Sequence, residues 1–428
     1  MISSAPRRIF SGRFTVVIRR TILTTLLLLC TALPAAAAPT AAKRHYSAHY
    51  VAEIRPQSGV IHVELKLSGE RLPKKIVLQV DPKRQRGFTS TDVLDVATTT
   101  VTWQPRGKFS RLNYDFVIDH ERAPGHYDSL LKNDWAIFRG DKLVPRARVT
   151  AVRGLESNAT LEFLLPEGWA VITPYGPTNA KVLHIDDATR RFDRPQGWML
   201  AGKLGSRAES IAGIQTLVAA PAGDGARRQD MLAFLNWNLP HLAGVFPTFP
   251  KRLLIVSAGD PMWRGGLSGP ASLFLHSSRP LISENRTSTL LHELVHVAMG
   301  IYGDSESDWI AEGFAEYYSI ETLRRSGGIG QSRYDDAIAR LARWGKGAPT
   351  LFAKESSGAR TARAVIALKA LDAEIRAATA GKASLDDVAR ELAVHNGKVS
   401  LERLQSVAAQ FAGRPLQSLE RSRLSAAG

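Results

Sequence analysis

Residues 290–300 read LLHELVHVAMG, the most informative segment of the sequence. The apolar residues around the polar ones favour a helix, and Gly300 is a typical helix stop. Positions i and i+4 of a helix share one face, so the imidazoles of His292 and His296 can converge on a single metal ion. Glu293 projects beside them, where a carboxylate can take a proton from a metal-activated water. The alternative interpretation is a buried helix whose two histidines and glutamate form hydrogen bonds within the core.

A second helix supplies the ligand that the first one lacks. Residues 307–318 read SDWIAEGFAEYY, and the short loop after Gly300 lets this helix pack antiparallel to the first. A zinc peptidase needs a third protein ligand from another element and keeps the fourth position open for water. We expect Glu312 to be that ligand and one Zn²⁺ to bind per chain. Glu316 lies one turn further along, where it can accept the free N–H of a ligating histidine, although a solvated or capping glutamate is an equal alternative.

Both motifs resemble the glycyl aminopeptidase family, a group of gluzincin zinc metallopeptidases related to the aminopeptidase N family. Weaker supporting segments are GGL at 265–267, LDAEIR at 371–376, SLDDV at 384–388 and LPEGW at 165–169. The resemblance implies an N-terminal β-sandwich, a thermolysin-like zinc peptidase domain and a C-terminal helical domain. It also implies peptide-bond hydrolysis with Glu293 as the general base, which makes Glu293 the predicted catalytic residue.

The chain departs from that family at two functional positions. The family's glycine-rich strand carries a glutamate that binds the free amino group of the substrate, whereas Ser268 and Gly269 follow the GGL segment here. Endopeptidase and aminopeptidase action therefore both stay open. The family's oxyanion tyrosine would fall near Thr361, and a missing oxyanion donor typically costs about 10²–10³ in turnover. The candidates to replace it, each with an ordinary surface role as the alternative, are Tyr334, Arg360 and Arg363.

The rest of the chain predicts a multidomain α+β protein. Residues 61–67, 75–80 and 160–165 alternate apolar and polar side chains, which is typical of antiparallel strands with one buried face. Helical periodicity begins near residue 229, and residues 272–275 follow the glycine-rich turn as an exposed strand. The predicted domains are a signal peptide (1–38), an N-terminal β-sandwich (39–165), a connecting region with strands (166–228), a thermolysin-like catalytic domain (229–330) and a C-terminal helical domain (331–428).

The first 38 residues have the pattern of a signal peptide. Five arginines come before or at the start of an apolar segment over 21–38, which ends in PAAAA. Small residues at this point suit cleavage near Ala38, with an N-terminal membrane anchor as the minor alternative. We therefore expect export, to the periplasm or outside the cell. Cys30 is the one cysteine of the chain and lies in this segment, so the mature protein would contain neither disulfides nor a thiol nucleophile.

Composition and charge limit the class of partner. With 428 residues, 44% hydrophobic and 22% charged, the chain is neither fibrous nor disordered. Loss of five arginines and no acid with the signal peptide lowers the formal charge from +16 to +11. For an exported protein this excess indicates solubility and loose attraction to anionic envelope surfaces, and no nucleic-acid module accompanies it.

These observations predict an exported zinc-dependent metallopeptidase that acts on peptide or protein substrates through a zinc-activated water. The alternative is a zinc-containing peptide-binding protein of the same fold, with weak or no catalysis. The sequence leaves the oligomeric state open.

Overall fold

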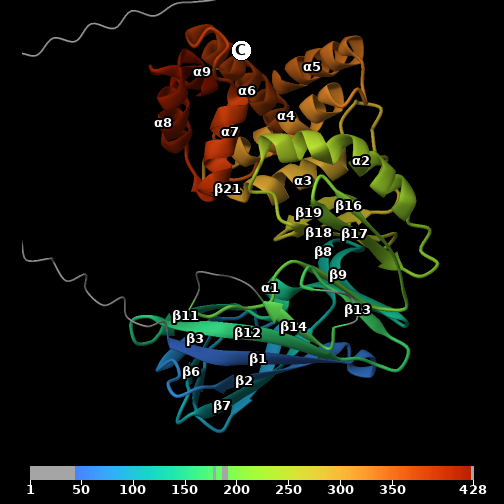
Figure 1. The fold of residues 1–428 in the computed structure, drawn as a ribbon, viewed down its shortest axis with the longest axis vertical. Coiled ribbons are helices and arrows are strands. Elements are labelled where there is room, and N and C mark those ends of the chain that lie inside the picture. Colours follow the sequence, from blue (N-terminus) through green and yellow to red (C-terminus); the bar gives the residue numbers. More distant parts are fainter. Residues whose placement is uncertain (1–43, 177–179, 186–190, 426–428) are drawn as a thin grey trace, which may run out of the picture. The chain divides into compact units, whose positions relative to one another are not determined.

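The computed structural model describes residues 44–176, 180–185 and 191–425, in which a strand-rich half is followed by a largely helical half (Figure 1). This order confirms the predicted α+β class. The predicted signal peptide and Cys30 lie outside the described residues. Within the described residues, no helix is both long and apolar enough to cross a membrane.

Two sheets share the first hydrophobic core. The six-stranded sheet has the order β14-β12-β1-β2-β7-β4 and the four-stranded sheet the order β11-β3-β6-β5. In β2, alternate residues such as Ile61, Val63 and Leu65 are buried, and they pack in one cluster with Ile76 and Leu78 of β3. The three alternating stretches of the sequence are thus confirmed as strands. The strands are β1 (Arg44–Arg55), β2 (Val60–Ser68), β3 (Lys75–Gln79), β4 (Gln85–Ser90), β5 (Val93–Val96), β6 (Thr100–Gln104), β7 (Phe109–Val117), β11 (Arg146–Thr150), β12 (Leu155–Leu164) and β14 (Val182–Ile185), with a 3₁₀ turn, η1 (Pro56–Ser58), after β1.

A third sheet joins the strand-rich half to the half that carries the zinc-binding pattern. Its order is β13-β15-β10-β9-β8, and every residue of β15 is buried. The ring of Trp198 in β15 packs against the ring of Phe274 with centroids 5.4 Å apart. The elements are β8 (His120–Ala123), β9 (His126–Lys132), β10 (Trp135–Arg139), the short α1 (Gly140–Leu143), β13 (Ala170–Ile172) and β15 (Trp198–Gly202).

The fourth sheet has the order β16-β17-β18-β20-β19 and supports the helices of the candidate site. Its elements are β16 (Leu204–Ile211), β17 (Ile214–Pro221), β18 (Arg252–Ala258), β19 (Gly266–Gly269) and β20 (Ser272–His276), with α2 (Arg228–Val245) between β17 and β18. The prediction of an exposed strand at 272–275 is wrong. β20 is buried at every position because β18 and β19 pair with its two edges and both of its faces are covered: Leu273 and Leu275 face the helical core, and Phe274 faces the core shared with β15.

The helical half begins with α3, whose ends follow from local chemistry. The side chain of Ser288 accepts a hydrogen bond from the Leu291 N–H at the start, and Gly300 ends the helix with φ +58°, a left-handed conformation that suits glycine. The elements are α3 (Thr289–Met299), β21 (Ile301–Gly303), α4 (Asp308–Arg325), α5 (Gln331–Gly345), α6 (Ala359–Ala378), α7 (Leu385–Val394), β22 (Gly397–Val399), α8 (Leu401–Ala412), η2 (Gln417–Leu419) and α9 (Arg421–Ser425). Their apolar faces form one continuous core with the helix-facing side of the fourth sheet.

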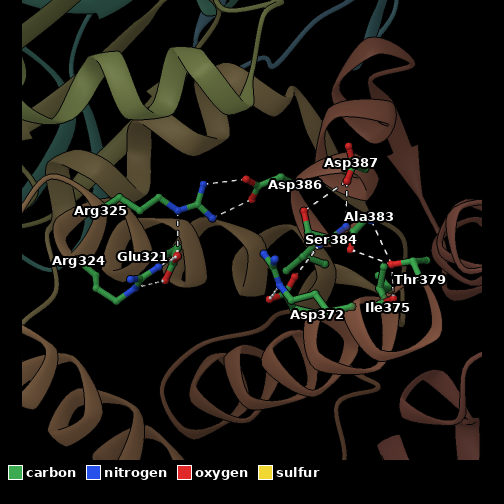
Figure 2. Close-up of polar contacts among 12 residues, drawn as sticks. Glu321, Arg324, Arg325, Asp372, Ile375, Thr379, Ala383, Ser384, Asp386 and Asp387 are labelled. Atoms are coloured by element: carbon green, nitrogen blue, oxygen red, sulfur yellow. Dashed lines mark hydrogen bonds and ion pairs between the residues drawn. The ribbon is translucent and has the colours of Figure 1, made fainter. Parts of the chain in front are cut away.

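A partly buried ionic network fixes the second half of α4. Figure 2 shows Arg325 between two carboxylates: it donates to Glu321 over 2.9 Å and to Asp386 of α7 over 2.8 Å. Tyr318 also donates to Asp386, over 2.9 Å. Burial raises the pKa of Glu321 and of Asp386, but their hydrogen bonds to arginine outweigh burial, so both carboxyls have a lowered pKa. The network ties α4, which carries the predicted third ligand, to α7.

Candidate metal centre

Three side chains from α3 and α4 bring their donor atoms together and form what is called the triangle below. The Nε2 atoms of His292 and His296 are 3.2 Å apart, Glu312 Oε2 lies 3.4 Å from the first nitrogen, and Glu312 Oε1 lies 3.3 Å from the second. A tetrahedral zinc ion with bonds of about 2.0–2.1 Å sets its ligand atoms about 3.3–3.4 Å apart, so this triangle has the size that zinc requires. Within the described residues, it is the one group of histidine, cysteine and acidic side chains with donors this close. The residues present therefore fit the metal.

Electrostatics at the triangle also suit a cation. Burial raises the pKa of Glu312, but hydrogen bonds with His292 and His296 outweigh burial and hold the pKa well below its ordinary value. The carboxylate is therefore ionised at neutral pH, as a metal ligand must be. About a quarter or less of each ligand side chain is exposed, 17% for His292, 16% for His296 and 27% for Glu312, so solvent has access to the centre.

Glu316 lies behind one of the histidines. Its Oε2 is 3.0 Å from Nδ1 of His292, the ring nitrogen that faces away from the triangle. A carboxylate in this place fixes the tautomer and orientation of a ligating imidazole. Burial lowers the pKa of His292, but the hydrogen bonds with Glu312 and Glu316 outweigh it and raise the pKa well above its ordinary value. The structure thus brings Glu316 to the position that the sequence interpretation gave it.

Glu293 occupies a space that a glycine keeps open. Its side chain is 8% exposed and packs against Gly266 of β19, where an added Cβ would lie 2.4 Å from Glu293 Cγ and 2.7 Å from Oε1. These distances are shorter than real Cβ contacts allow. The first part of the edge strand and the carboxylate therefore depend on each other. Gly266 of the GGL segment therefore leaves the space that the Glu293 side chain occupies.

The triangle opens into a cavity of about 1130 Å³. Glu293, Asp308 and Glu312 line it from α3 and α4, together with the two histidines. The residues that line it from the strand-rich half are Arg122, Arg146, Pro174, Tyr175 and Gln196. This half contributes no carboxylate to the described lining, so the metal-binding wall is acidic and the other wall is basic or neutral.

Comparisons with solved structures show which proteins have a similar fold. The chain superposes on an aminopeptidase N family protein from Idiomarina loihiensis with a TM-score of 0.63 and 15% identity, over 81% of this chain and 70% of that one. The fold is that of the M1 zinc metallopeptidases. A mutant M1 zinc metallopeptidase from Deinococcus radiodurans gives a TM-score of 0.56 with 15% identity, over 89% of this chain and 93% of that one. No protein-family model matches the chain. No curated protein matches it either.

The oxyanion candidates predicted from the sequence lie elsewhere on this M1 fold, outside the described lining of the cavity. Arg360 donates to the carbonyls of Thr350 and Glu355, and Arg363 donates to those of Ala348 and Arg423. The ring of Tyr334 is buried and has Arg324 and Lys369 against it. Thr361, near which the resemblance puts the family's tyrosine, is also buried and forms a hydrogen bond with Ser356.

Two other tyrosines do line the cavity, Tyr175 and Tyr302. The Tyr175 hydroxyl accepts a hydrogen bond from the Gln196 N–H over 2.7 Å. Tyr302 is 61% exposed in β21, shortly after the end of α3. Its position just beyond the histidine helix was a signal in the sequence, whereas nothing in the sequence connects Tyr175 with that helix.

Proposed function

We propose that the protein is an exported zinc-dependent metallopeptidase that hydrolyses peptide bonds with Glu293 as general base. The observation that carries this proposal is the triangle of His292, His296 and Glu312, whose edges of 3.2–3.4 Å suit zinc, with Glu293 beside it in one cavity. The M1 metallopeptidase fold supports the same reaction class.

Each residue of the centre then has a chemical role. A bound zinc ion supplies Lewis-acid chemistry, since it lowers the pKa of water to about 7 and polarises a carbonyl. Glu293 takes the proton of the attacking water as oxygen bonds to the carbonyl carbon, and gives it to the amine nitrogen as the C–N bond breaks. Glu316 holds His292 in one orientation throughout. The products are a carboxylic acid and an amine, and Glu293 returns to its starting state.

The strand β19 suits the binding of a substrate backbone. It is the edge strand of its sheet and lines the cavity, and an edge strand offers N–H and C=O groups to an extended peptide. Its position is held from the strand-rich half: Arg139 donates to the Ser268 carbonyl over 3.1 Å and Trp198 Nε1 to the Leu267 carbonyl over 2.8 Å. We infer that a peptide lies along β19 with its scissile bond at the metal.

The export part of the proposal rests on the sequence of residues 1–38. Cell fractionation with N-terminal sequencing of the mature chain tests it. The expected result is a new amino terminus near residue 39 in the exported fraction. A chain that keeps Met1 and stays in the cytoplasm would contradict export, and a chain that keeps Met1 in the membrane fraction would favour the N-terminal anchor.

The activity is tested with Glu293→Gln and a mixed peptide library. Wild type should cleave the library, and the variant should keep its zinc and its fold while losing cleavage. Equal cleavage by the variant would exclude Glu293 as the base. Specific peptide binding by wild type without any cleavage would instead favour the alternative, a binding protein of this fold. This alternative stays open because Ser268 follows the GGL segment where the family has a glutamate, and Thr361 lies near the place of the family's oxyanion tyrosine. Peptides with acetylated amino termini distinguish endopeptidase from aminopeptidase action.

A further inference from the structure

Two arginines of the strand-rich half lie where the metal cavity meets a second cavity. Arg122 in β8 and Arg146 at the start of β11 line both the metal cavity and an adjoining one of about 420 Å³. Both side chains are exposed, and neither forms an ion pair with a carboxylate of the described residues. The neighbouring Arg139 differs, because Asp141 neutralises it over 3.0 Å. Arg122 and Arg146 therefore offer uncompensated positive charge to whatever occupies the cavity.

The positions of both arginines are supported by regular structure. The guanidinium of Arg122 lies over the ring of Trp263, 5.1 Å from its centroid, and the backbone N–H of Trp263 donates to the Tyr127 carbonyl over 2.8 Å. Arg146 opposes Gln79 in the β11–β3 ladder. A guanidinium held against an aromatic face loses less freedom when it binds a ligand than one on a free side chain. Arg122 is thus held by a ring contact, and both arginines extend from paired strands where the two cavities meet.

The acidic groups that line the two cavities have partners other than Arg122 and Arg146, or belong to the metal centre. In the second cavity, Asp128 bonds to His120 over 2.6 Å, Asp141 pairs with Arg139, and Asp81 accepts from the Lys83 N–H over 3.0 Å. In the metal cavity the carboxylates belong to α3 and α4, and Asp308 among them accepts from the Ser356 N–H over 2.7 Å. Since no described carboxylate pairs with Arg122 or Arg146, both guanidinium groups are available to an anionic group of a ligand.

We propose that Arg122 and Arg146 form a carboxylate-binding subsite, so that the cavity selects peptides with a carboxylate on a residue away from the scissile bond. The inference rests on the proposed peptidase function for its biological meaning. Arginine binds carboxylates through paired N–H donors, and such charge-assisted bonds are about twice as strong as neutral ones. The carboxylate is an acidic side chain or the free carboxyl end of the substrate, and these share the same chemistry.

Binding to the Glu293→Gln protein tests this subsite without any need for cleavage. The probes are fluorescent peptides of one sequence that carry Glu or Gln in turn at each position, each made with a free and with an amidated carboxyl end. The best acidic peptide should bind about tenfold or more tightly than its neutral twin, and less so at high salt. Dependence on the Glu position identifies an acidic side chain as the ligand, and dependence on amidation identifies the carboxyl end.

Matched variants distinguish binding by this subsite from nonspecific attraction by the overall positive charge of the protein. Adding Arg122→Gln and Arg146→Gln together should abolish the preference for acidic peptides, whereas Arg148→Gln, an exposed arginine of the same strand outside both cavities, should keep it. Arg146→Glu alone should turn the preference towards peptides with lysine. Unchanged thermal unfolding shows that each variant is folded.

The outcomes for the subsite and for the peptidase differ. Equal affinity for acidic and neutral peptides, or a preference that survives both Arg→Gln changes, would overturn the subsite even if wild type cleaves peptides. A preference that depends on these arginines in a protein that cleaves nothing would support the subsite and refute the peptidase function.

Discussion

The substitution Gly266→Ala tests how Glu293 is positioned without changing any residue of the metal triangle. The new Cβ would lie 2.4 Å from Glu293 Cγ, 2.7 Å from Oε1 and 2.9 Å from Cδ, so the carboxylate must move by the order of an ångström. The three nearest contacts are all atoms of one flexible side chain, so the backbone can stay in place. A displacement of this size at a reacting group lowers turnover by about 10²-fold. We expect kcat to fall by that factor with little change in KM.

The matched control is Gly269→Ala on the same strand. There the nearest atom to an added Cβ is Trp198 Cδ1 at 3.3 Å, and the next is at 3.5 Å, so the substitution requires a shift of only a few tenths of an ångström. Peptide cleavage, zinc content and thermal unfolding should be measured for both variants. Both should keep zinc, and their free energies of unfolding should stay within about 1 kcal/mol of wild type. Wild-type turnover in Gly266→Ala, or an equal loss in both variants, would refute the argument from Glu293 packing.

Two further substitutions test the surroundings of the centre. Glu316→Gln should weaken zinc binding by about 10–100-fold, because the His292 Nδ1 atom loses its anionic partner at 3.0 Å; competition with a chelator measures this, and an unchanged affinity would count against the role of Glu316. Glu321→Gln should destabilise the protein by about 3 kcal/mol at neutral pH, because it removes the charge of a buried carboxylate that accepts hydrogen bonds from Arg324 and Arg325. The pKa of Glu321 is lowered from 4.5 by folding, so its stabilising contribution is present above pH 4.5 and is lost as the pH falls through the folded-state pKa. Urea unfolding of wild type and variant should therefore converge below pH 4.5, and a difference that stays constant down to pH 3 would contradict this reasoning.

The centre was predictable because it depends on local periodicity. His292 and His296 share a face through helix geometry alone. The short connection between α3 and α4 makes the two helices pack together, which brings Glu312 close to the histidines. Glu316 follows by the same spacing. The donor distances of 3.2–3.4 Å, by contrast, depend on how α3 and α4 pack, which no local pattern specifies.

The other wall of the cavity could not be predicted in this way. Arg122 and Arg146 are more than a hundred residues from the histidines in sequence, and they reach the cavity from two different sheets, Arg122 from β8 of the third sheet and Arg146 from β11 of the four-stranded sheet. The burial of β20 was missed for a related reason: a strand paired on both edges and covered on both faces has no polar side, so its sequence does not alternate. The oxyanion candidates Arg360 and Arg363 follow from a count along the chain, and that count does not reveal that their guanidinium groups donate to the backbone carbonyls of Glu355 and Ala348.

Two imidazoles and the Glu312 carboxylate are expected to hold one zinc ion, and the zinc content of the purified protein shows whether they do. Elemental analysis of wild type, His296→Ala and Glu293→Gln, all prepared with the same zinc supply, is sufficient. We expect about one zinc per chain in wild type and in Glu293→Gln, and almost none in His296→Ala. Wild type without zinc, or His296→Ala with a full zinc equivalent, would contradict this expectation.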